Sequence, residues 1–580
     1  MGLSRREFLR IMAAAGAAGL PTASRSDADF YALPSFGNVS LLHFTDCHAQ
    51  LMPIYFREPS FNIGIGDSTN VPPHIVGDHF LRHFGIAPES PEAYAYTYLN
   101  FEEVAHRYGK VGGFAHLATL IKRIREQRPG SLLLDGGDTW QGSATALWTK
   151  GQDMVDACKL LGVDIMTGHW EFTYGMERVR EIIDTELNEH VEFLAQNVVL
   201  TDDAQFDDKP AFDSESGLVF KPYSIRQING VAIGVIGQAF PYTPLANPRY
   251  LIEDWSFGIR DEQAQKMVDD VRSQGAEVVV ILSHNGMDVD LKMASRLTGV
   301  DVILGGHTHD GIPTPSIVTN PNGKTLVINS GSNGKFLSVL DLDVRGGRLD
   351  DYRFKMLPVF SNLLDPDPAM QEHIRQVRTP YEAQLSEVLA TTDTTLYRRG
   401  NFSGTFDQVI LDAMMQVRGA DIAFSPGFRW GTSIPTGGTI TMERLMDQTG
   451  ITYAKSTLTD ITGENIKLIL EDIADNLFNP DPYYQMGGDM VRVGGLSYTI
   501  NPLQKIGQRL SNLELKGEPL NPSKTYRVAG WASVNPQPDD LPDIWDVVAE
   551  YLRDKQVIGD VVPNVPKVVG ISGNAGFAQI

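Results

Sequence analysis

The sequence predicts an α/β protein with at least two domains. Short apolar, β-branched runs such as "VSLLHFTD", "SLLLDGGD" and "EVVVILSHNG" alternate with amphipathic stretches such as "FAHLATLIKRIREQ" up to about residue 357. The chain has 580 residues, which is too long for one ordinary domain and enough for two cores. A content of 42% hydrophobic and 21% charged residues is typical of a soluble globular protein.

A segment rich in proline and aspartate indicates where the domains meet. "SNLLDPDPAM" is typical of a boundary, and "QEHIRQVRTPYEAQLSEVL" predicts a connecting helix with a break at Pro380. We therefore expect a first domain over 36–357, a linker and connecting helix over 358–396, and a second domain over 397–580. The last stretch, "VGISGNAGFAQI", is expected to be a loose tail.

Residues 1–30 predict an export signal rather than part of the fold. Arg5 and Arg6 lie in "SRREFLR", and the Ala-rich apolar run that follows is too short to span a bilayer. This segment resembles a twin-arginine signal, which implies a periplasmic protein delivered in folded form. The alternative is a chance basic helix in a cytoplasmic enzyme. Cys47 and Cys158 are the only cysteines, so we expect no disulfide framework.

The charge balance excludes two classes of partner. The formal net charge is -23 and the isoelectric point is near 5.0, whereas binding to nucleic acid or to an anionic membrane requires clustered Lys and Arg. We expect neither partner, and we expect a monomer. An anionic substrate must then be attracted by local positive charge.

Polar residues at five predicted strand ends indicate a metal site. A single Asp at such a place can cap a helix, and a lone His is more often a satisfied polar residue than a ligand. Two carboxylates and five imidazoles at the carboxyl edge of one sheet instead predict a divalent-metal centre. These residues are Asp46, His48, Asp138, His169, His284, His307 and His309.

The motifs around these residues resemble a known family. Asp-x-His, Gly-Gly-Asp-x-x-Gln-Gly, Gly-His-Trp-Glu-Phe, Ser-His-Asn-Gly and Gly-Gly-His-Thr-His are similar to the 5'-nucleotidase branch of the calcineurin-like metallophosphoesterases. "LDAMMQVRGADIAFSPGFRWG" and "SYTINP" extend the likeness into the second domain. Within this branch, "FTDCHAQLMPIYFREPS", "GHWEFTYG" and the twin-arginine start look most like the Sox-system thiosulfohydrolases. The resemblance implies a four-layer αββα sandwich followed by a smaller α/β domain of the 5'-nucleotidase C-terminal type.

The resemblance also implies an activity and a division of the ligands. The family releases sulfate from a cysteine S-thiosulfonate on a carrier protein during thiosulfate oxidation, using a hydroxide on a dimanganese site. Carried over by position, one metal is held by Asp46, His48 and His309, the other by His169, His284 and His307, and Asp138 bridges them. Such a mixed ligand set suits manganese, zinc or iron, so manganese rests on the resemblance alone.

Trp170 marks the departure from the nucleotidase pattern. Nucleotidases carry Asn-His followed by an Asp at this turn, whereas this chain has His169, Trp170 and Thr173. An alkoxide leaving group is a strong base and benefits from a nearby proton donor, while a persulfide leaves with less help. The substitution therefore favours thiosulfonate hydrolysis with Trp170 in the active site. The alternative is that Trp170 packs in a decayed nucleotidase.

Two further segments are expected near the substrate. Arg429, in "SPGFRWG", is suited to bidentate contact with sulfate oxygens, although it could also be an exposed surface arginine. "YYQMGGDM", residues 483–490, is a second candidate lining of the same cleft. The long insertion over 53–110 is expected to form a channel for the flexible arm of a carrier protein.

Two functions of other classes stay open. A periplasmic 5'-nucleotidase or sugar-nucleotide phosphohydrolase would share the fold and metals, but it needs an aromatic sandwich for the base in the second domain. A non-enzymatic periplasmic binding protein would need no open two-metal site, and the full ligand set argues against it.

Overall fold

The computed structural model describes residues 30–187 and 190–578. The expected export signal lies outside the described residues, apart from its last position, Phe30. Within the described ranges, no helix combines the length and the apolar character that crossing a membrane requires.

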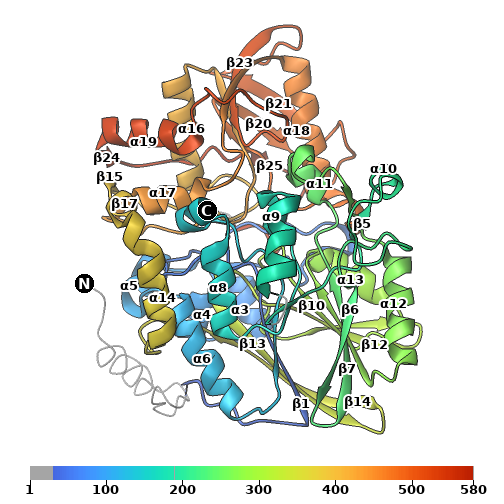
Figure 1. Ribbon diagram of the computed structural model, residues 1–580. Helices are drawn as coiled ribbons and strands as arrows, with labels where there is room; N and C mark the ends of the chain where they lie inside the picture. The colour runs from blue at the N-terminus through green and yellow to red at the C-terminus, as the bar shows by residue number, and fades with distance from the viewer. Residues whose placement is uncertain (1–29, 188–189, 579–580) are drawn as a thin grey trace.

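The first domain contains two six-stranded sheets packed face to face (Figure 1). The first sheet has the order β14 (Arg348–Pro358), β13 (Phe336–Arg345), β1 (Val39–Phe44), β2 (Leu132–Asp135), β3 (Ile165–Met166) and β4 (Glu192–Phe193). The second has the order β11 (Ser316–Asn320), β12 (Gly323–Asn329), β10 (Val302–Gly305), β9 (Val278–Ser283), β7 (Val231–Gln238) and β6 (Tyr223–Ile228).

Helices cover the outer face of each sheet. Because both faces of the sheets are covered, central strands such as β1 and β9 are buried along their whole length, as their unbroken apolar runs predict. Leu41 and Leu134 of the first sheet pack against Val280 of the second, which forms the middle of the sandwich. The outer layers are α6 (Phe114–Glu126) and α8 (Gln152–Leu161) on the first sheet, and α12 (Asp261–Ser273) and α13 (Met287–Arg296) on the second. The predicted four-layer αββα architecture is confirmed.

The second domain is a smaller mixed α/β unit, orange to red at the top of Figure 1. It is reached through α14 (Pro368–Arg378), a short 3-10 turn containing Pro380, and α15 (Glu382–Leu385). Its helices are α16 (Thr405–Arg418), α17 (Met442–Thr449), α18 (Gly463–Phe478) and α19 (Ile544–Lys555). Its sheets are β17 (Thr439–Thr441), β15 (Val388–Thr392) and β24 (Val557–Ile558); β18 (Ser456–Thr462), β23 (Thr525–Trp531), β16 (Ile422–Ser425) and β19 (Arg492–Gly494); and β22 (Glu518–Pro519), β21 (Leu510–Leu515), β20 (Leu496–Ile500) and β25 (Lys567–Val568).

The insertion over 53–110 is folded and connects the two domains. It contains α3 (Gly77–Phe84), α4 (Pro91–Tyr96) and α5 (Phe101–Tyr108), with many buried side chains. An isolated bridge joins Tyr55 to Ser433 of the second domain. The insertion is therefore a packed structural element rather than an unstructured loop, and its role in forming a channel for a carrier arm stays a prediction.

The expected loose tail is wrong for the part that the structure describes, which ends at residue 578. Ile571 and Ala575 are buried, and Phe577 pairs with Phe61 of the insertion. The backbone N–H of Asn62 also donates to the carbonyl of Gly576 at 2.8 Å. Contacts with a distant part of the chain hold this tail, which its polar, glycine-containing sequence does not reveal.

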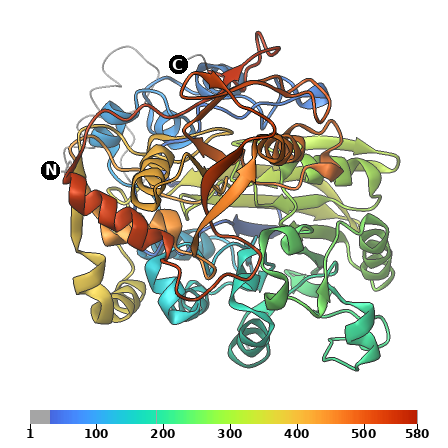
Figure 2. The ribbon, with the colours of Figure 1, turned by 90° about the horizontal axis from the view of Figure 1, so that it is seen from above.

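The parallel strands of both sheets end at the edge that faces the second domain (Figures 1 and 2). In the view from above, the second domain lies over this edge. The loops after β1, β2, β3, β9 and β10 carry the predicted metal ligands, so the site lies between the two domains.

Candidate metal centre

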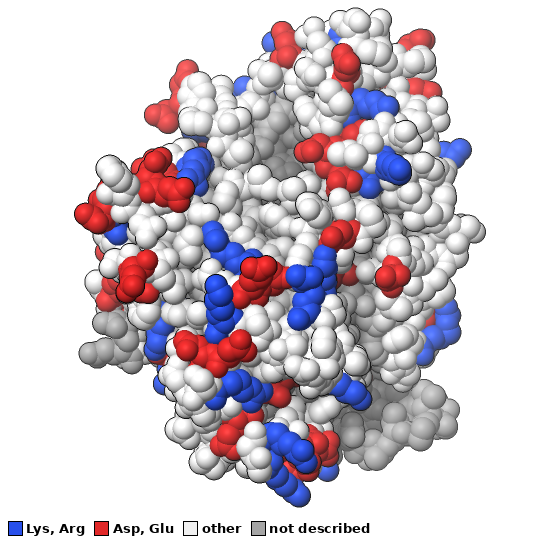
Figure 3. Space-filling view, turned by 90° about the vertical axis from the view of Figure 1, so that its right-hand side faces the viewer, with Lys and Arg blue, Asp and Glu red and all other residues white. Residues whose placement is uncertain are grey.

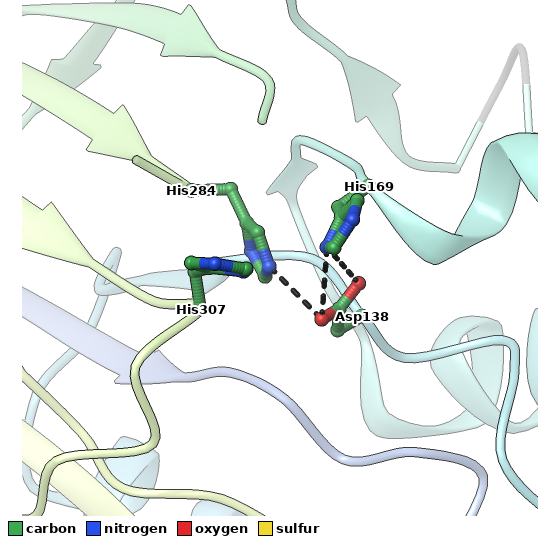
Figure 4. Close-up of side chains that lie close together, drawn as sticks. All are labelled: Asp138, His169, His284 and His307. Atoms are coloured by element: carbon green, nitrogen blue, oxygen red, sulfur yellow. Dashed lines mark hydrogen bonds and ion pairs between the residues drawn. The ribbon is translucent and has the colours of Figure 1, made fainter. Parts of the chain in front are cut away.

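The structure brings all seven predicted ligands together in two overlapping groups. One ligand atom from each residue of a group lies within 4.8 Å of those of the others, and every one of these residues is buried. The groups are Asp46, His48, Asp138 and His309, and Asp138, His169, His284 and His307. Only Asp138 belongs to both groups, and Figure 4 shows it facing His169 and His284. This arrangement places a carboxylate between two adjacent cation positions.

Unusual backbone conformations aim these side chains at one point. Five of the ligands have positive φ angles, which non-glycine residues rarely adopt. They are Asp46 (53°), His48 (45°), Asp138 (58°), His307 (74°) and His309 (60°). Each such conformation costs about 1–3 kcal/mol and persists where the surroundings enforce it, most often at functional sites.

Glu171 connects the loops that carry two of the ligands. This fully buried carboxylate accepts backbone N–H groups from Thr139 at 2.7 Å, His169 at 2.8 Å and Asp138 at 3.2 Å. It fixes the loop after β2 against the loop after β3, as outer partners of a metal site do. The sequence alone did not predict this role of Glu171, whose position two residues after a predicted ligand was the only available signal.

Electrostatics keep most of the imidazoles neutral, as metal ligation requires. Burial lowers the pKa of His48 to about 4. Burial, with further repulsion from other cationic groups including Arg429, lowers the pKa of His307 and His309 well below the ordinary value. Burial also lowers the pKa of His169.

The pKa values of Asp138 and His284 are shifted toward the charged forms because each group stabilises the charge of the other. Burial opposes ionisation of Asp138, but His169 and His284 hold its pKa well below the ordinary value. Burial likewise opposes protonation of His284, but the charges of Asp138 and Asp46 raise its pKa to about 10. The buried carboxylates of Asp46 and Asp138 are therefore stabilised by positive charge among the imidazoles, which a proton or a divalent cation can supply.

The directions of the donor atoms fit two divalent ions. His284 Nδ1 lies 2.6 Å from the carbonyl oxygen of Gly136, so a proton on Nδ1 leaves Nε2 free, 3.0 Å from Asp138. His48 Nε2 and His309 Nε2 face each other at 3.0 Å. Imidazole and carboxylate ligands of this kind suit manganese, zinc or iron.

A cavity of about 290 Å³ opens over the ligands. Its lining also includes aromatic side chains from both domains. They are Trp170, Phe240, Tyr242, Phe428 and Trp430. Phe240, which follows β7 and was not predicted from the sequence, stacks on His307 with ring centroids 4.0 Å apart.

The Trp170 side chain lines this cavity and also packs against aromatic side chains of the second domain. Its side chain is 6% exposed and meets the rings of Phe428 and Trp430 edge-on, with centroids 5.4 and 5.0 Å away. Its backbone N–H donates to Asp138 Oδ1 at 2.8 Å. Thr173 lies elsewhere, where its hydroxyl pairs with that of Thr452 at 2.6 Å in the contact between the domains.

Arg429 reaches toward the ligands from the turn after β16. Its side chain is 15% exposed, so it is not the exposed surface arginine of the alternative interpretation. Nη2 donates to the carbonyl of Gly488 at 2.8 Å, and Nε lies 3.5 Å from Asp489 Oδ1. Residues 483–490, a candidate lining of this cleft in the sequence, thus provide neighbours of Arg429, and residues 486–489 line the cavity.

A second, polar cavity of about 60 Å³ adjoins the first and shares His307 and Arg429 with it. Its lining includes His74 of the insertion and Arg399, which is 7% exposed. Arg399 was not predicted from the sequence, where the doubled arginine in "LYRRGNF" is its only signal.

Comparisons with known proteins agree with this fold and site. Residues 384–536 match the family model described as "5'-nucleotidase, C-terminal domain". The 5'-nucleotidase of Rattus norvegicus is 27% identical over 467 residues, covering 72% of this chain and 76% of that protein. The human 5'-nucleotidase is 25% identical over 466 residues, with the same two coverages of 72% and 76%.

Two solved structures extend the likeness over nearly the whole chain. The sulfate thiohydrolase SoxB of Thermus thermophilus, in complex with glycerol, is 35% identical with a TM-score of 0.86, covering 93% of this chain and 98% of that one. A 5'-nucleotidase precursor from the same species is 22% identical with a TM-score of 0.70, covering 92% and 99%, and supports the fold alone. The chain belongs to the 5'-nucleotidase family and has the calcineurin-like metallophosphoesterase fold. It is a metal-dependent hydrolase of that family.

Proposed function

We propose that the protein hydrolyses a cysteine S-thiosulfonate on a carrier protein and releases sulfate. A water oxygen bonds to the terminal sulfur, the sulfur–sulfur bond breaks, and its electron pair leaves on the persulfide. The two protons of the water pass to solvent or to the products. The 35% identity to a sulfate thiohydrolase over 93% of the chain supports this choice within the family.

The lining of the aromatic cavity carries the proposal, because it offers no free acid to a leaving group. Among the described residues that line it, every imidazole belongs to a predicted metal ligand. Asp489 is held by arginines, and the hydroxyl of Tyr242 donates to the carbonyl of Tyr483. A leaving group here departs unprotonated, which a persulfide does more easily than an alkoxide.

The side chains around the cavity have separate tasks in this reaction. Two divalent ions bound by the seven ligands would lower the pKa of a shared water and orient it for in-line attack. Arg429 binds the sulfonate oxygens. Trp170 excludes bulk water with its ring and holds the Asp138 carboxylate through its backbone N–H.

Nucleotide hydrolysis is the second candidate, favoured by the family match over 384–536 and by the curated relatives. It predicts two aromatic rings spaced to hold a base. Phe428 and Trp430 instead stack directly on each other, with centroids 3.9 Å apart and planes 18° apart, so no base fits between them. A non-enzymatic binding protein would not need seven converging ligands.

We also propose that the protein works in the periplasm, on a sulfur-carrier protein of the Sox type. The twin-arginine pattern in residues 1–30 supports this location. Figure 3 shows positive and negative side chains interspersed over one face of the molecule, without a large area of one sign. On that face, recognition of a carrier would depend on shape more than on charge.

A side-by-side comparison of substrates tests the proposal. Manganese-loaded protein receives a thiosulfonated carrier or a panel of nucleotides and sugar nucleotides, and released sulfate and phosphate are measured by ion chromatography. We expect sulfate release to exceed phosphate release by orders of magnitude, and Asp138→Asn to abolish it. Efficient phosphate release without sulfate release would reject the thiosulfonate in favour of the nucleotide.

A further inference from the structure

Asp489 lies at the centre of a buried cluster of three arginines. Its side chain is 3% exposed. One oxygen accepts a hydrogen bond from Arg492 Nη2 at 3.0 Å and lies 3.9 Å from Arg399 Nη1, and the other lies 3.5 Å from Arg429 Nε. A single carboxylate thus faces three guanidinium groups whose side chains are at most 15% exposed.

The three arginines have different surroundings. Arg492 is 1% exposed, and its Nε lies 3.3 Å from Asp407, so it is held within the second domain. Arg429 instead lines both cavities beside His307, and Arg399 lines the smaller one. Arg492 therefore anchors one side of Asp489, while the other side is directed at the arginines near the metal ligands.

Backbone contacts strengthen this arrangement. The backbone N–H of Asp489 donates to the carbonyl of Gly427 at 2.8 Å, which ties its segment to the turn that carries Arg429. Arg429 Nη2 donates to the carbonyl of the preceding residue, Gly488, at 2.8 Å. Asp489 and Gly488 thus contact Arg429 at both its turn and its guanidinium.

We propose that Asp489 is a positioning residue that holds Arg429 ready for the anionic group of the substrate, an inference that rests on the proposed function. A free arginine side chain samples many rotamers, and holding it beforehand reduces the entropy lost when it binds an anion. The carboxylate also favours the charge of Arg399, which the neighbouring Arg429 disfavours. Removing Asp489 leaves Arg429 present but poorly placed.

A double-mutant cycle tests whether Asp489 acts through Arg429. Sulfate release from the thiosulfonated carrier is measured as kcat/KM for Asp489→Asn, Arg429→Ala and the double variant. We expect losses of about 10-fold for Asp489→Asn and about 10- to 100-fold for Arg429→Ala, the scale of a charge-assisted contact. The double variant should be no more than about twofold worse than Arg429→Ala alone. Multiplied losses would overturn the proposal.

Controls separate positioning from general stability. Asp341 is an equally buried carboxylate that accepts hydrogen bonds from Arg128 at 2.8 and 2.9 Å, and it pairs with Ser40 at the far end of β1. Asp341→Asn should reduce stability but leave kcat/KM per folded enzyme unchanged. Asp489→Glu, which keeps the charge, should lose less activity than Asp489→Asn. Equal losses of activity in Asp489→Glu and Asp489→Asn would contradict the proposal.

The cycle also remains informative if the proposed function fails. Asp489→Asn should retain two metal ions by elemental analysis, because it contacts none of the seven ligands' side chains in the described structure. If the wild-type protein hydrolyses only a nucleotide, the thiosulfonate assignment is rejected. The same double-mutant cycle, measured with that nucleotide, then tests the role of Asp489. Multiplied losses of kcat/KM in the double variant would again contradict the proposal.

Discussion

The two sides of the cleft are built in different ways. The metal wall, formed by the seven predicted ligands, comes entirely from loops after strands of the first domain. The aromatic wall, defined here as residues 428–430 and 486–489, comes from two separate loops of the second domain. The first is held by strained backbone and by Glu171, and the second by packed rings and buried ion pairs. This division suggests that the metal wall determines the type of hydrolysis and the aromatic wall determines the substrate.

The largest expected effect comes from the residue shared by both metal positions. Asp138→Asn should lower hydrolysis of any substrate by at least about 100- to 1000-fold, because a neutral amide bridges two cations poorly. Bound metal measured by elemental analysis should fall with it. Asp153→Asn, which alters a carboxylate that is 2% exposed in α8, is the control and should retain both metals. An Asp138→Asn protein with full activity would show that the metal wall does not control the chemistry.

Gly487 lies where the two walls touch, so it tests their independence. Its φ angle is +78°, and an added Cβ would approach His307 Nε2 to 2.0 Å. Gly487→Ala should displace His307 or the loop and reduce metal affinity by about 10- to 100-fold, as losses around metal ligands do.

The neighbouring glycine provides the matched control. Gly488 has a φ angle of +76°, but its added Cβ would meet only the Gly427 carbonyl, at 3.7 Å. Gly488→Ala should carry a similar backbone cost without the loss of metal. Equal metal affinities for the two variants, measured by competition with a chelator, would show that the contact with His307 is unimportant.

Trp170 is expected to affect selectivity and packing more than rate. Trp170→His should not raise sulfate release, because the leaving group needs no acid, and lost ring contacts should lower it by about 2- to 10-fold. Trp170→Phe keeps an apolar ring and serves as the control. A large gain in sulfate release from Trp170→His would contradict both the leaving-group argument and the separation of the walls.

The sequence predicts the metal wall well because each ligand directly follows an apolar run. Parallel strands bring their carboxyl ends to one edge, so Asp46, Asp138 and His284 can be expected to converge without knowledge of any long-range contact. The alternation of apolar runs and helices predicts an α/β domain, whereas the four-layer sandwich was implied by the family resemblance. Glu171 was missed because its role depends on backbone N–H groups, which carry no sequence signal.

The aromatic wall is harder to predict because its contacts are distant in sequence. Asp489 faces Arg399 and Arg429 only after the second domain has folded, and no periodic pattern connects these positions. The tail is similar, since Phe577 meets Phe61 from the opposite end of the chain. Burial of single charged residues in such contacts is decided by tertiary packing, which local patterns do not describe.

The smallest predicted effect concerns an ion pair outside both walls. His74 Nε2 of the insertion lies 2.8 Å from Asp288 Oδ2 at the start of α13, with side chains 13% and 10% exposed. Burial opposes the charge on His74, but Asp288 raises its pKa above 6.5. Burial also opposes the charge on Asp288, but His74 lowers its pKa below 3.8. Each partner therefore favours the ionised form of the other in the folded protein.

These directions fix the sign of the pH dependence. The raised pKa of His74 gives stability that is complete below pH 6.5 and lost as the pH rises through the folded value, while the contribution of Asp288 is present above pH 3.8 and lost in acid. The pair should thus stabilise the protein most between these values. His74→Gln should remove about 0.5–1 kcal/mol of stability at pH 6 and little at pH 9, as measured by denaturant unfolding at both values. Ser68→Ala, which removes a 3.0 Å hydrogen bond to Asp288, should cost stability similarly at both pH values. If His74→Gln lowers stability equally at pH 6 and pH 9, the ion pair does not contribute through its charge, and the insertion is held by apolar packing alone.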